Sequence, residues 1–504
     1  MHITASKLYD YLQCPHKVWR DVYGPQDEKI QEANPFVKLL WEKGVVHEER
    51  IIKELGEYID LSKGSFEERF KKTIEAIENG NPLIYQGVLI YENYLGIPDL
   101  LKRMPDGKYI PVDIKSGSGF EGASEDLEED GKPKPHYAVQ LCFYIELLQK
   151  LELPNTGTGK IIDIHKDEVE YNLNSPIGKI NKMTWWEFYA QAKNNVLVLL
   201  ANEEKNKPAI SGACKLCPWY NSCKKWCKEN EDLSCLFDLG RSKRDTISQD
   251  TGANKISDLD NLDIDHLLEQ KKKDKTFLYK IGKSGLEKIV QRSVIFNKTK
   301  KPVLYSNIDF PKVSYELFFD IEADPTRDFV YMHGVYERNG DKERFIDFTA
   351  KDGTREAEEE AFANFWDYIR SLPKDDFSVY YYSHYEKTMY RKMQKQYPDV
   401  ASAEEIESFF ANPKTIDLYQ FVKKNTDWPL GSYSIKDIAQ YLGFSWRDKT
   451  PSGALSIQWF NEYLKSKDEK ILKRILEYNE DDCKATMVLK DGIEKINKLT
   501  YGTV

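Results

Sequence analysis

The stretch Tyr-Glu-Leu-Phe-Phe-Asp-Ile-Glu at residues 315–322 sets acids in an otherwise apolar run. A run of this composition favours a buried β-strand. Because side chains alternate between the two faces of a strand, Asp320 and Glu322 share one face. Buried carboxylates need a compensating charge or a metal, and this spacing suits a pair of metal ions about 4 Å apart. The stretch therefore predicts a metal-binding strand in an α/β domain that begins near residue 314.

A second acidic stretch, near the carboxyl end, predicts another part of the same site. Tyr478 and Asp482 are four residues apart in a helix-forming segment, so both side chains face one side of the helix. The Tyr478 hydroxyl could then hydrogen-bond the attacking water. Together with Asp320 and Glu322, these residues resemble the DEDD family of 3′–5′ exonucleases, in the version where a tyrosine accompanies the last aspartate.

This resemblance covers about residues 314–500 and implies an RNase H-like fold. The implied ligands of Mg²⁺ or Mn²⁺ are Asp320, Glu322, Glu386 and Asp482, and the implied catalytic residue is Tyr478. Family members supply an aspartate where this chain has Glu386, and Asp417 competes for that place. A glutamate reaches about one methylene further, so a degenerate domain that binds nucleic acid without cutting it stays open.

The amino-terminal region holds a separate group of charged residues. Asp99 lies near the end of an expected strand, and Asp113 and Lys115 stand two residues apart on one face of the next. The two aspartates could bind Mg²⁺ or Mn²⁺, hard ions that prefer carboxylate oxygens. Lys115 would position or activate the attacking water and offset the charge of the phosphate.

Three further residues extend this group into an ordered series. His47 lies upstream on an expected helix, and Gln140 and Tyr144 stand four residues apart on another helix. The series resembles the PD-(D/E)xK nucleases of the RecB type over about residues 1–236, which implies a restriction-endonuclease-like fold. The implied metal ligands are His47, Asp99 and Asp113, and the implied catalytic residues are Lys115, Gln140 and Tyr144.

The cysteines indicate a metal or iron–sulfur site. Cys214, Cys217, Cys223 and Cys227 lie within 14 residues, and Cys14 stands near the start. In a chain of this size a disulfide framework is not expected, and four thiolates can hold Zn²⁺ or a [4Fe–4S] cluster. The split order resembles the iron–sulfur staple of CRISPR-associated RecB-like exonucleases and AddB-type nucleases. It implies a structural [4Fe–4S] cluster, with Zn²⁺ as the alternative, on Cys14, Cys214, Cys217 and Cys223; Cys227 could replace Cys223.

The segment between the two regions is basic. Residues 271–301 hold eleven basic residues against two acidic ones, which predicts a helical connector over 237–313 with a basic face. Lys271, Lys272 and Lys273 are expected to contact a nucleic-acid backbone. Residues 281–286 loosely resemble helix-hairpin-helix duplex binders, and a plain basic linker is the alternative.

Composition limits the class of protein. The 504 residues carry a net charge of −10, which excludes a generic basic nucleic-acid coat. Mean hydropathy is −0.63, and we find neither an apolar run long enough to span a membrane nor a secretory signal sequence. We therefore expect a cytoplasmic protein with no membrane contact.

These observations lead to one hypothesis and two alternatives. We expect an α/β multidomain chain with a RecB-like PD-(D/E)xK domain at 1–236, a helical connector at 237–313 and an RNase H-like exonuclease domain at 314–504. It would be a metal-dependent DNA nuclease acting on ends or single-stranded tails, with a helicase, a CRISPR protein or a repair protein as partner. The alternatives are a nucleic-acid-binding adaptor with an inactive nuclease domain and an RNA-processing exonuclease.

Overall fold

The structure is a computed structural model that describes residues 2–30, 35–121, 132–178, 182–201 and 206–502. Its packing divides the chain into two compact units. Unit 1 comprises residues 1–208 and 212–223, and unit 2 comprises residues 209–211 and 224–504. The three-segment division expected from the sequence, with boundaries after 236 and 313, stays a prediction. Within the described ranges, no helix is both long and apolar enough to cross a membrane.

Unit 1 is built on a mixed sheet with the strand order β11-β10-β7-β6-β3-β2. Its strands are β2 (Ile59–Asp60), β3 (Leu83–Tyr85), β6 (Leu100–Arg103), β7 (Tyr109–Ile114), β10 (Gly159–Ile162) and β11 (Glu168–Tyr171). One smaller sheet has the order β1 (Ile3–Thr4), β5 (Tyr94–Gly96), β4 (Leu89–Tyr91), and another pairs β8 (Phe120–Glu121) with β9 (Lys132–Pro133). The helices are α1 (Ala5–Gln13), α2 (Pro15–Tyr23), α3 (Pro35–Glu54), α4 (Phe66–Glu78), α5 (Pro135–Lys150) and α6 (Trp185–Ala201).

Helices cover both faces of the large sheet. Along β7, Tyr109 belongs to the core formed with α1, α5 and α6, whereas Ile110 and Val112 pack with Ile51 of α3. This alternation is the pattern of a strand buried on both faces, and every residue of β7 is buried. Asp113 shares the face of Tyr109, so its carboxylate points toward the α5 side of the sheet.

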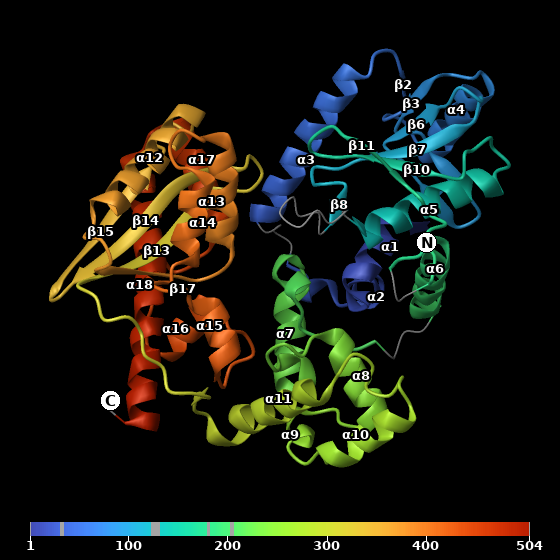
Figure 1. Ribbon diagram of the computed structural model, residues 1–504. Helices are drawn as coiled ribbons and strands as arrows, with labels where there is room; N and C mark the ends of the chain where they lie inside the picture. Colours follow the sequence, from blue (N-terminus) through green and yellow to red (C-terminus); the bar gives the residue numbers. More distant parts are fainter. Residues whose placement is uncertain (1, 31–34, 122–131, 179–181, 202–205, 503–504) are drawn as a thin grey trace. The chain divides into compact units, whose positions relative to one another are not determined.

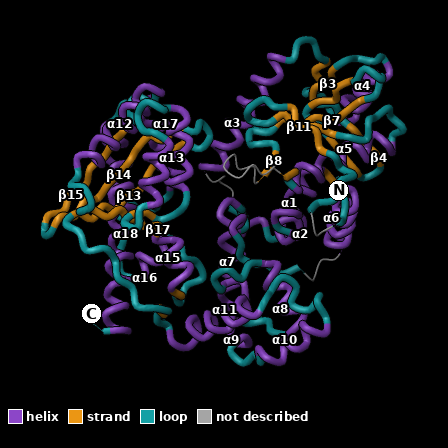
Figure 2. The backbone as a smooth tube through the Cα atoms, in the orientation of Figure 1, coloured by secondary structure: helices purple, strands orange, loops and turns teal. Residues whose placement is uncertain are grey.

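Unit 2 begins with a helical segment that has a core of its own. After α7 (Tyr220–Glu229), which crosses the boundary between the units, come α8 (Arg241–Thr251), α9 (Ile256–Leu259), α10 (Ile264–Lys273) and α11 (Lys283–Val294). Leucine and isoleucine side chains from these helices form one buried cluster. Figure 2 shows helices and loops without strands in this part of the chain.

A five-stranded sheet with the order β15-β14-β13-β16-β17 forms the rest of unit 2. Its strands are β13 (Tyr315–Asp324), β14 (Phe329–Asn339), β15 (Lys342–Thr349), β16 (Phe377–Tyr381) and β17 (Thr415–Asp417), and β12 (Val303–Leu304) pairs separately with β18 (Thr426–Asp427). The helices are α12 (Arg355–Ser371), α13 (Tyr385–Gln396), α14 (Ala403–Ala411), α15 (Leu418–Asn425), α16 (Ile435–Tyr441), α17 (Gly453–Ser466) and α18 (Glu469–Tyr501).

The two faces of this sheet carry different helices. Leu317, Phe319 and Ile321 of β13 pack in a core with α12, α13 and α14, whereas Phe318 packs in a core that includes α15, α16 and α18. Figure 1 shows α18 running along the sheet, and it contacts β13, β14 and β16. Asp320 therefore lies on the face that α18 covers.

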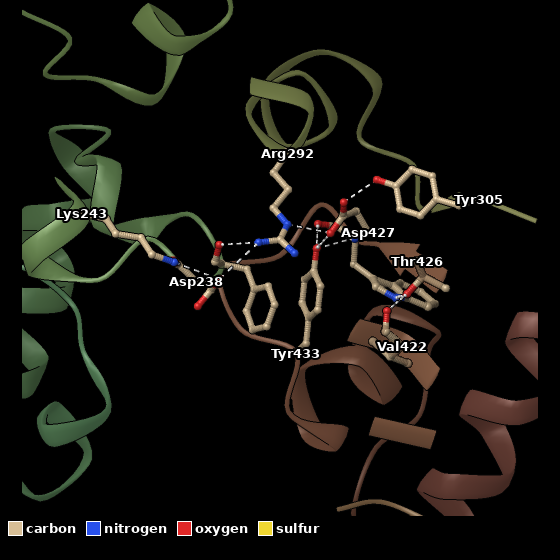
Figure 3. Close-up of polar contacts among 10 residues, drawn as sticks. Asp238, Lys243, Arg292, Tyr305, Val422, Thr426, Asp427 and Tyr433 are labelled. Carbon is tan, nitrogen blue, oxygen red and sulfur yellow. Dashed lines mark hydrogen bonds and ion pairs between the residues drawn. The ribbon is translucent and has the colours of Figure 1, made fainter. Parts of the chain in front are cut away.

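A buried ion pair joins the helical segment to the sheet region within unit 2. Figure 3 shows Arg292 of α11 reaching Asp427 of β18, with 2.7 Å between Nε and Oδ1. The Tyr433 hydroxyl donates to the same oxygen at 3.1 Å, and the Tyr305 hydroxyl donates to the other. Asp427 is fully buried and Arg292 is nearly so, so each charge depends on the other.

We expect Arg292→Met to destabilise unit 2 by about 3–5 kcal/mol, because the Asp427 carboxylate would stay buried without its cation. Urea unfolding measures this change. Lys283→Met, which removes an exposed ion pair with Glu287, is the matched control and should alter the free energy of unfolding by less than about 0.5 kcal/mol. Equal effects of the two substitutions would contradict the assignment.

Candidate metal centres and active sites

Three carboxylates converge where β13 meets α18. One carboxylate oxygen from each of Asp320, Glu322 and Asp482 lies within 4.8 Å of the other two. The pairing of β13 with β14 changes register between Glu322 and Ala323, an irregularity of the kind that redirects side chains beside active sites. The acids predicted from the two stretches of sequence therefore form one cluster.

A glycine allows α18 to come this close to the sheet. Gly334 of β14 stands directly opposite Asp320 on β13, and a Cβ atom at Gly334 would lie 1.6 Å from Oδ1 of Asn479. Asn479 of α18 uses that space, and its Nδ2 donates to Oδ2 of Asp320 at 2.8 Å. The missing side chain of Gly334 thus lets α18 reach the strand that carries Asp320 and Glu322.

Tyr478 is held beside the acids by a lysine. Nζ of Lys436, from α16, donates to the Tyr478 hydroxyl at 3.0 Å, and the hydroxyl also hydrogen-bonds Asp482. Nε1 of Trp446 donates to Oδ1 of Asp482 at 2.6 Å. The sequence predicts Tyr478 as part of the site but neither Lys436 nor Trp446, because both come from segments distant in sequence from the acids.

The electrostatics of the cluster fit a divalent cation. Burial and the neighbouring acids raise the pKa of Asp320 well above its usual range and the pKa of Glu322 to about 8. Burial also raises the pKa of Asp482, an effect that Lys436 opposes. Carboxylates so close together repel one another unless a proton or a cation lies between them, and carboxylate oxygens are the ligands that Mg²⁺ and Mn²⁺ prefer.

Glu386 lies near this cluster without completing it. It is buried at the start of α13, and its charge contributes to the raised pKa of Asp320, yet it is outside the group of three. Ser383 has a φ of 151°, and its hydroxyl donates to Oε2 of Glu386 at 3.2 Å. Asp417 caps α15, with Oδ1 accepting from the Tyr419 amide at 2.9 Å.

Unit 1 contains a second group of acids beside a lysine. Nζ of Lys115 lies 2.8 Å from Oδ2 of Asp113, and Oδ2 of Asp99 accepts from the Ile114 amide at 2.7 Å. Burial and Asp113 raise the pKa of Asp99 well above its usual range. Burial alone would lower the pKa of Lys115, but Asp113 and Asp99 raise it. Asp99 and Lys115 line a cavity of about 490 Å³.

Gln140 and Tyr144 of α5 lie on the same side of the sheet. Gln140 lines the cavity, and within the described part of the chain its buried Oε1 has no hydrogen-bond partner. Tyr144 is buried, and burial together with Asp113 and Asp99 raises the pKa of its hydroxyl. An unpartnered oxygen beside two carboxylates is the kind of donor that fits a bound cation.

His47 does not line this cavity, whereas its neighbour Glu48 does. The His47 Nε2 atom lies 3.1 Å from the carbonyl oxygen of Asp163. Oε1 of Glu48 instead accepts from Nε2 of Gln86 at 3.1 Å, and the same nitrogen donates to Oδ1 of Asp99 at 3.2 Å. Glu48 is thus the α3 residue linked to the acids, which the order of residues in the sequence did not reveal.

Two of the four predicted cluster cysteines, Cys217 and Cys223, interact electrostatically with the other thiols. Burial raises the pKa of the Cys217 thiol, with further contributions from Cys14 and Cys214. Burial raises the pKa of Cys223 to about 12, and the other three thiols add to the effect. These interactions fit a donor set of four thiolates. Cys227 shares a hydrogen bond with Cys235 instead.

The three predicted DNA-contacting lysines differ in their surroundings. Nζ of Lys271 donates to the carbonyl oxygens of Phe277 and Leu278 at 2.9 and 2.7 Å, so its charge closes the turn after α10. Lys272 and Lys273 are exposed. Two of the three ammonium groups are therefore presented to solvent.

Comparisons with known proteins identify the carboxyl-terminal region. The sequence profile of the RNase H superfamily matches residues 317–493. No curated protein matches the chain. A solved structure titled "Crystal structure of SSO0001" aligns with 44% of this chain and 86% of its own length, at 18% identity and a TM-score of 0.21. The chain is thus a mixed α/β, multidomain protein whose carboxyl-terminal region is RNase H-like, a fold of the metal-dependent nuclease type.

Gly334→Ala is expected to separate α18 from β13, because the new methyl group would overlap the Asn479 amide. Overpacking of this kind costs about 1–3 kcal/mol, and stabilisation by Mg²⁺ should be lost as well. Urea unfolding with and without Mg²⁺ measures both. Gly453→Ala, whose Cβ would meet no atom within 4 Å, is the control. Adding Asn479→Ala should restore stability to Gly334→Ala; no recovery would argue against this contact.

We expect Mg²⁺ to raise the melting temperature more at pH 8 than at pH 6. With the pKa of Glu322 near 8, the folded protein holds a proton that the unfolded chain has already released, so metal-free stability falls as pH rises from about 4.5 to 8. Mg²⁺ must displace this proton at pH 6 but binds an ionised carboxylate at pH 8.

Differential scanning fluorimetry at both pH values measures the shift. The double variant Asp320→Asn, Asp482→Asn removes two charges of the cluster and should abolish the difference between the two pH values. Equal shifts at pH 6 and pH 8 in the unmodified protein would show that these acids do not bind the ion.

Proposed function

We propose that this protein is a metal-dependent nuclease that hydrolyses phosphodiester bonds at DNA ends or single-stranded tails, with one active site in each unit. The observation that carries the proposal is the convergence of Asp320, Glu322 and Asp482 within 4.8 Å beside Tyr478. This arrangement lies in a region matched by the RNase H superfamily. Such nucleases typically use divalent metal ions, and the carboxylate cluster supplies the oxygens that they prefer.

In unit 2, Asp320, Glu322 and Asp482 would hold Mg²⁺ or Mn²⁺, and Glu386 would complete the set. The ion, when bound, polarises the phosphoryl oxygen and favours attack by water. The Tyr478 hydroxyl, fixed by Lys436 and Asp482, would orient that water toward the phosphorus. Lys436 places a positive charge where the phosphate charge grows.

In unit 1, Asp99 and Asp113 would hold the ion, with Gln140 as a neutral neighbour. The pKa of Lys115 is raised, so this ammonium stays charged at neutral pH and would offset the phosphate charge. Together with the predicted role of Tyr144, this arrangement supports a RecB-like PD-(D/E)xK site, whereas the metal-binding role of His47 stays a prediction. Asp113, at the end of β7, and Lys115, just after the strand, stand in the order that such a site requires.

The cysteines would hold a structural [4Fe–4S] cluster, or Zn²⁺, on Cys14, Cys214, Cys217 and Cys223. Such a cluster would link the junction of α1 and α2 to the segment at 212–223. Trp219 already links the two segments, because its Nε1 donates to Oδ1 of Asp21 at 2.9 Å.

We further propose a cytoplasmic location and action beside a helicase or a CRISPR or repair protein. Exposed Lys272 and Lys273 would attract the DNA backbone.

A second candidate function is a nucleic-acid-binding adaptor. It is favoured by the position of Glu386 outside the group of three carboxylates, which would leave the unit 2 site short of one ligand. Unit 1 could still cut, since Lys115 is in contact with Asp113.

Cleavage of single-stranded DNA labelled at either end, with Mg²⁺ or Mn²⁺, tests both functions. Lys115→Ala and Asp320→Ala should each remove a distinct set of products, with losses of about 100-fold or more, and the double variant should be inactive. Lys108→Ala and Asp341→Ala, which alter exposed residues, are matched controls and should cut normally.

Three outcomes would change the proposal. If Lys115→Ala alone removes cleavage, the RNase H-like region binds without cutting. If a matched RNA is cut faster than DNA, the protein is an RNA-processing nuclease. If the intact protein cuts neither polymer, it is an adaptor.

A further inference from the structure

The cavity of unit 1 has an aromatic wall that the proposed chemistry does not use. Beside Asp99 and Lys115, its lining includes Tyr9 of α1, Trp41 of α3, and His136 and Tyr137 of α5. Tyr9 meets His136 with ring centres 5.0 Å apart, and His136 meets Tyr137 at 4.4 Å, both edge to face. Three rings therefore form one continuous surface.

Trp41 is the most accessible of these rings. Its side chain is 66% exposed, although an indole is among the largest apolar groups that a fold can bury. Tyr9 is 37% exposed. An exposed indole and an exposed phenol that line one cavity are unfavourable in water but suit a flat, apolar ligand surface.

The charge of Lys115 in this cavity indicates that the ligand also carries an anionic group. Nζ of Lys115 lies 5.6 Å from the centre of the Tyr137 ring, so cation and aromatic surface are adjacent. Nucleotides combine a flat ring with an anionic phosphate. The volume of about 490 Å³ is within the range of small-ligand pockets.

We propose that one unpaired base of the substrate stacks on Trp41, against the wall of Tyr9 and His136, while its phosphate lies at Lys115. The inference rests on the proposed nuclease function and adds the residues that select the substrate strand. A base inside a duplex exposes its edges in the grooves rather than its face, so the interior of a duplex cannot make this contact. Stacking on a ring tolerates any base, so the site selects single strands without reading sequence.

Fluorescence of 2-aminopurine, which stacking on an aromatic ring quenches, reports the contact directly. The full chain carries Asp113→Asn and Asp320→Asn to prevent cleavage, and 2-aminopurine is placed at successive positions of a single-stranded oligonucleotide. In this background one position near an end should be quenched. Adding Trp41→Ala should remove that quenching and weaken binding about tenfold, whereas Trp41→Phe should restore most of both.

Val45→Ala is the matched control, because Val45 is on the same helix, is 55% exposed and does not line the cavity. It should leave quenching and affinity unchanged. A second measurement uses the cleaving protein: an abasic site at the quenched position should slow cutting in the unmodified protein and have no further effect in Trp41→Ala.

The outcomes separate this inference from the proposed function. Quenching that depends on Trp41 in a protein that never cuts DNA would retain the base site and reject the nuclease. Normal cleavage with quenching and affinity identical in Trp41→Ala and Val45→Ala would overturn the stacking site alone. Equal binding of duplex and single-stranded DNA would also overturn it.

Discussion

The close approach of α18 to β13 is the constraint on which the unit 2 site depends. Asp482 can join Asp320 and Glu322 only because Gly334, on the neighbouring strand, leaves room for Asn479. The Asn479 amide then holds Asp320 through a hydrogen bond of 2.8 Å. Hydrogen bonds from Tyr478, Lys436 and Trp446 build outward from this contact. The packing of α18 on the sheet therefore sets the geometry of the carboxylate cluster.

Both sites place acids on a strand that is buried on its two faces. In β7 and β13, successive apolar side chains point alternately into two cores. Asp113 takes the place of an apolar residue on one face of β7, and Asp320 and Glu322 do so on one face of β13. Burying carboxylates without a counter-charge costs several kcal/mol, which appears as raised pKa values at Asp99, Asp320 and Glu322. Lys115 compensates part of this cost in unit 1. In unit 2 Lys436 opposes the raised pKa values of Asp320 and Asp482 without overcoming them, so a bound divalent ion has more to contribute there.

The parts of the site that could be predicted are those set by local spacing. Residues two apart on a strand, such as Asp320 and Glu322, or four apart on a helix, such as Tyr478 and Asp482, meet whatever the rest of the fold does. The contributions of Glu48, Lys436 and Trp446 could not be predicted, because they depend on how distant elements pack. The same reason explains why Lys271 is occupied by the carbonyl groups of its own turn while its neighbours are exposed.

The sequence by itself determined the two acidic strands, the helix that carries Tyr478 and Asp482, the crowding of cysteines after residue 213 and the basic character of 271–301, because each follows from composition and short-range period. Tertiary structure alone decided which α3 residue faces the acids of unit 1, that Gly334 lies opposite Asp320, and that Arg292 finds Asp427 across 135 residues of chain. These facts depend on the distance between elements and on the space left between their side chains. No local pattern of residues encodes either quantity.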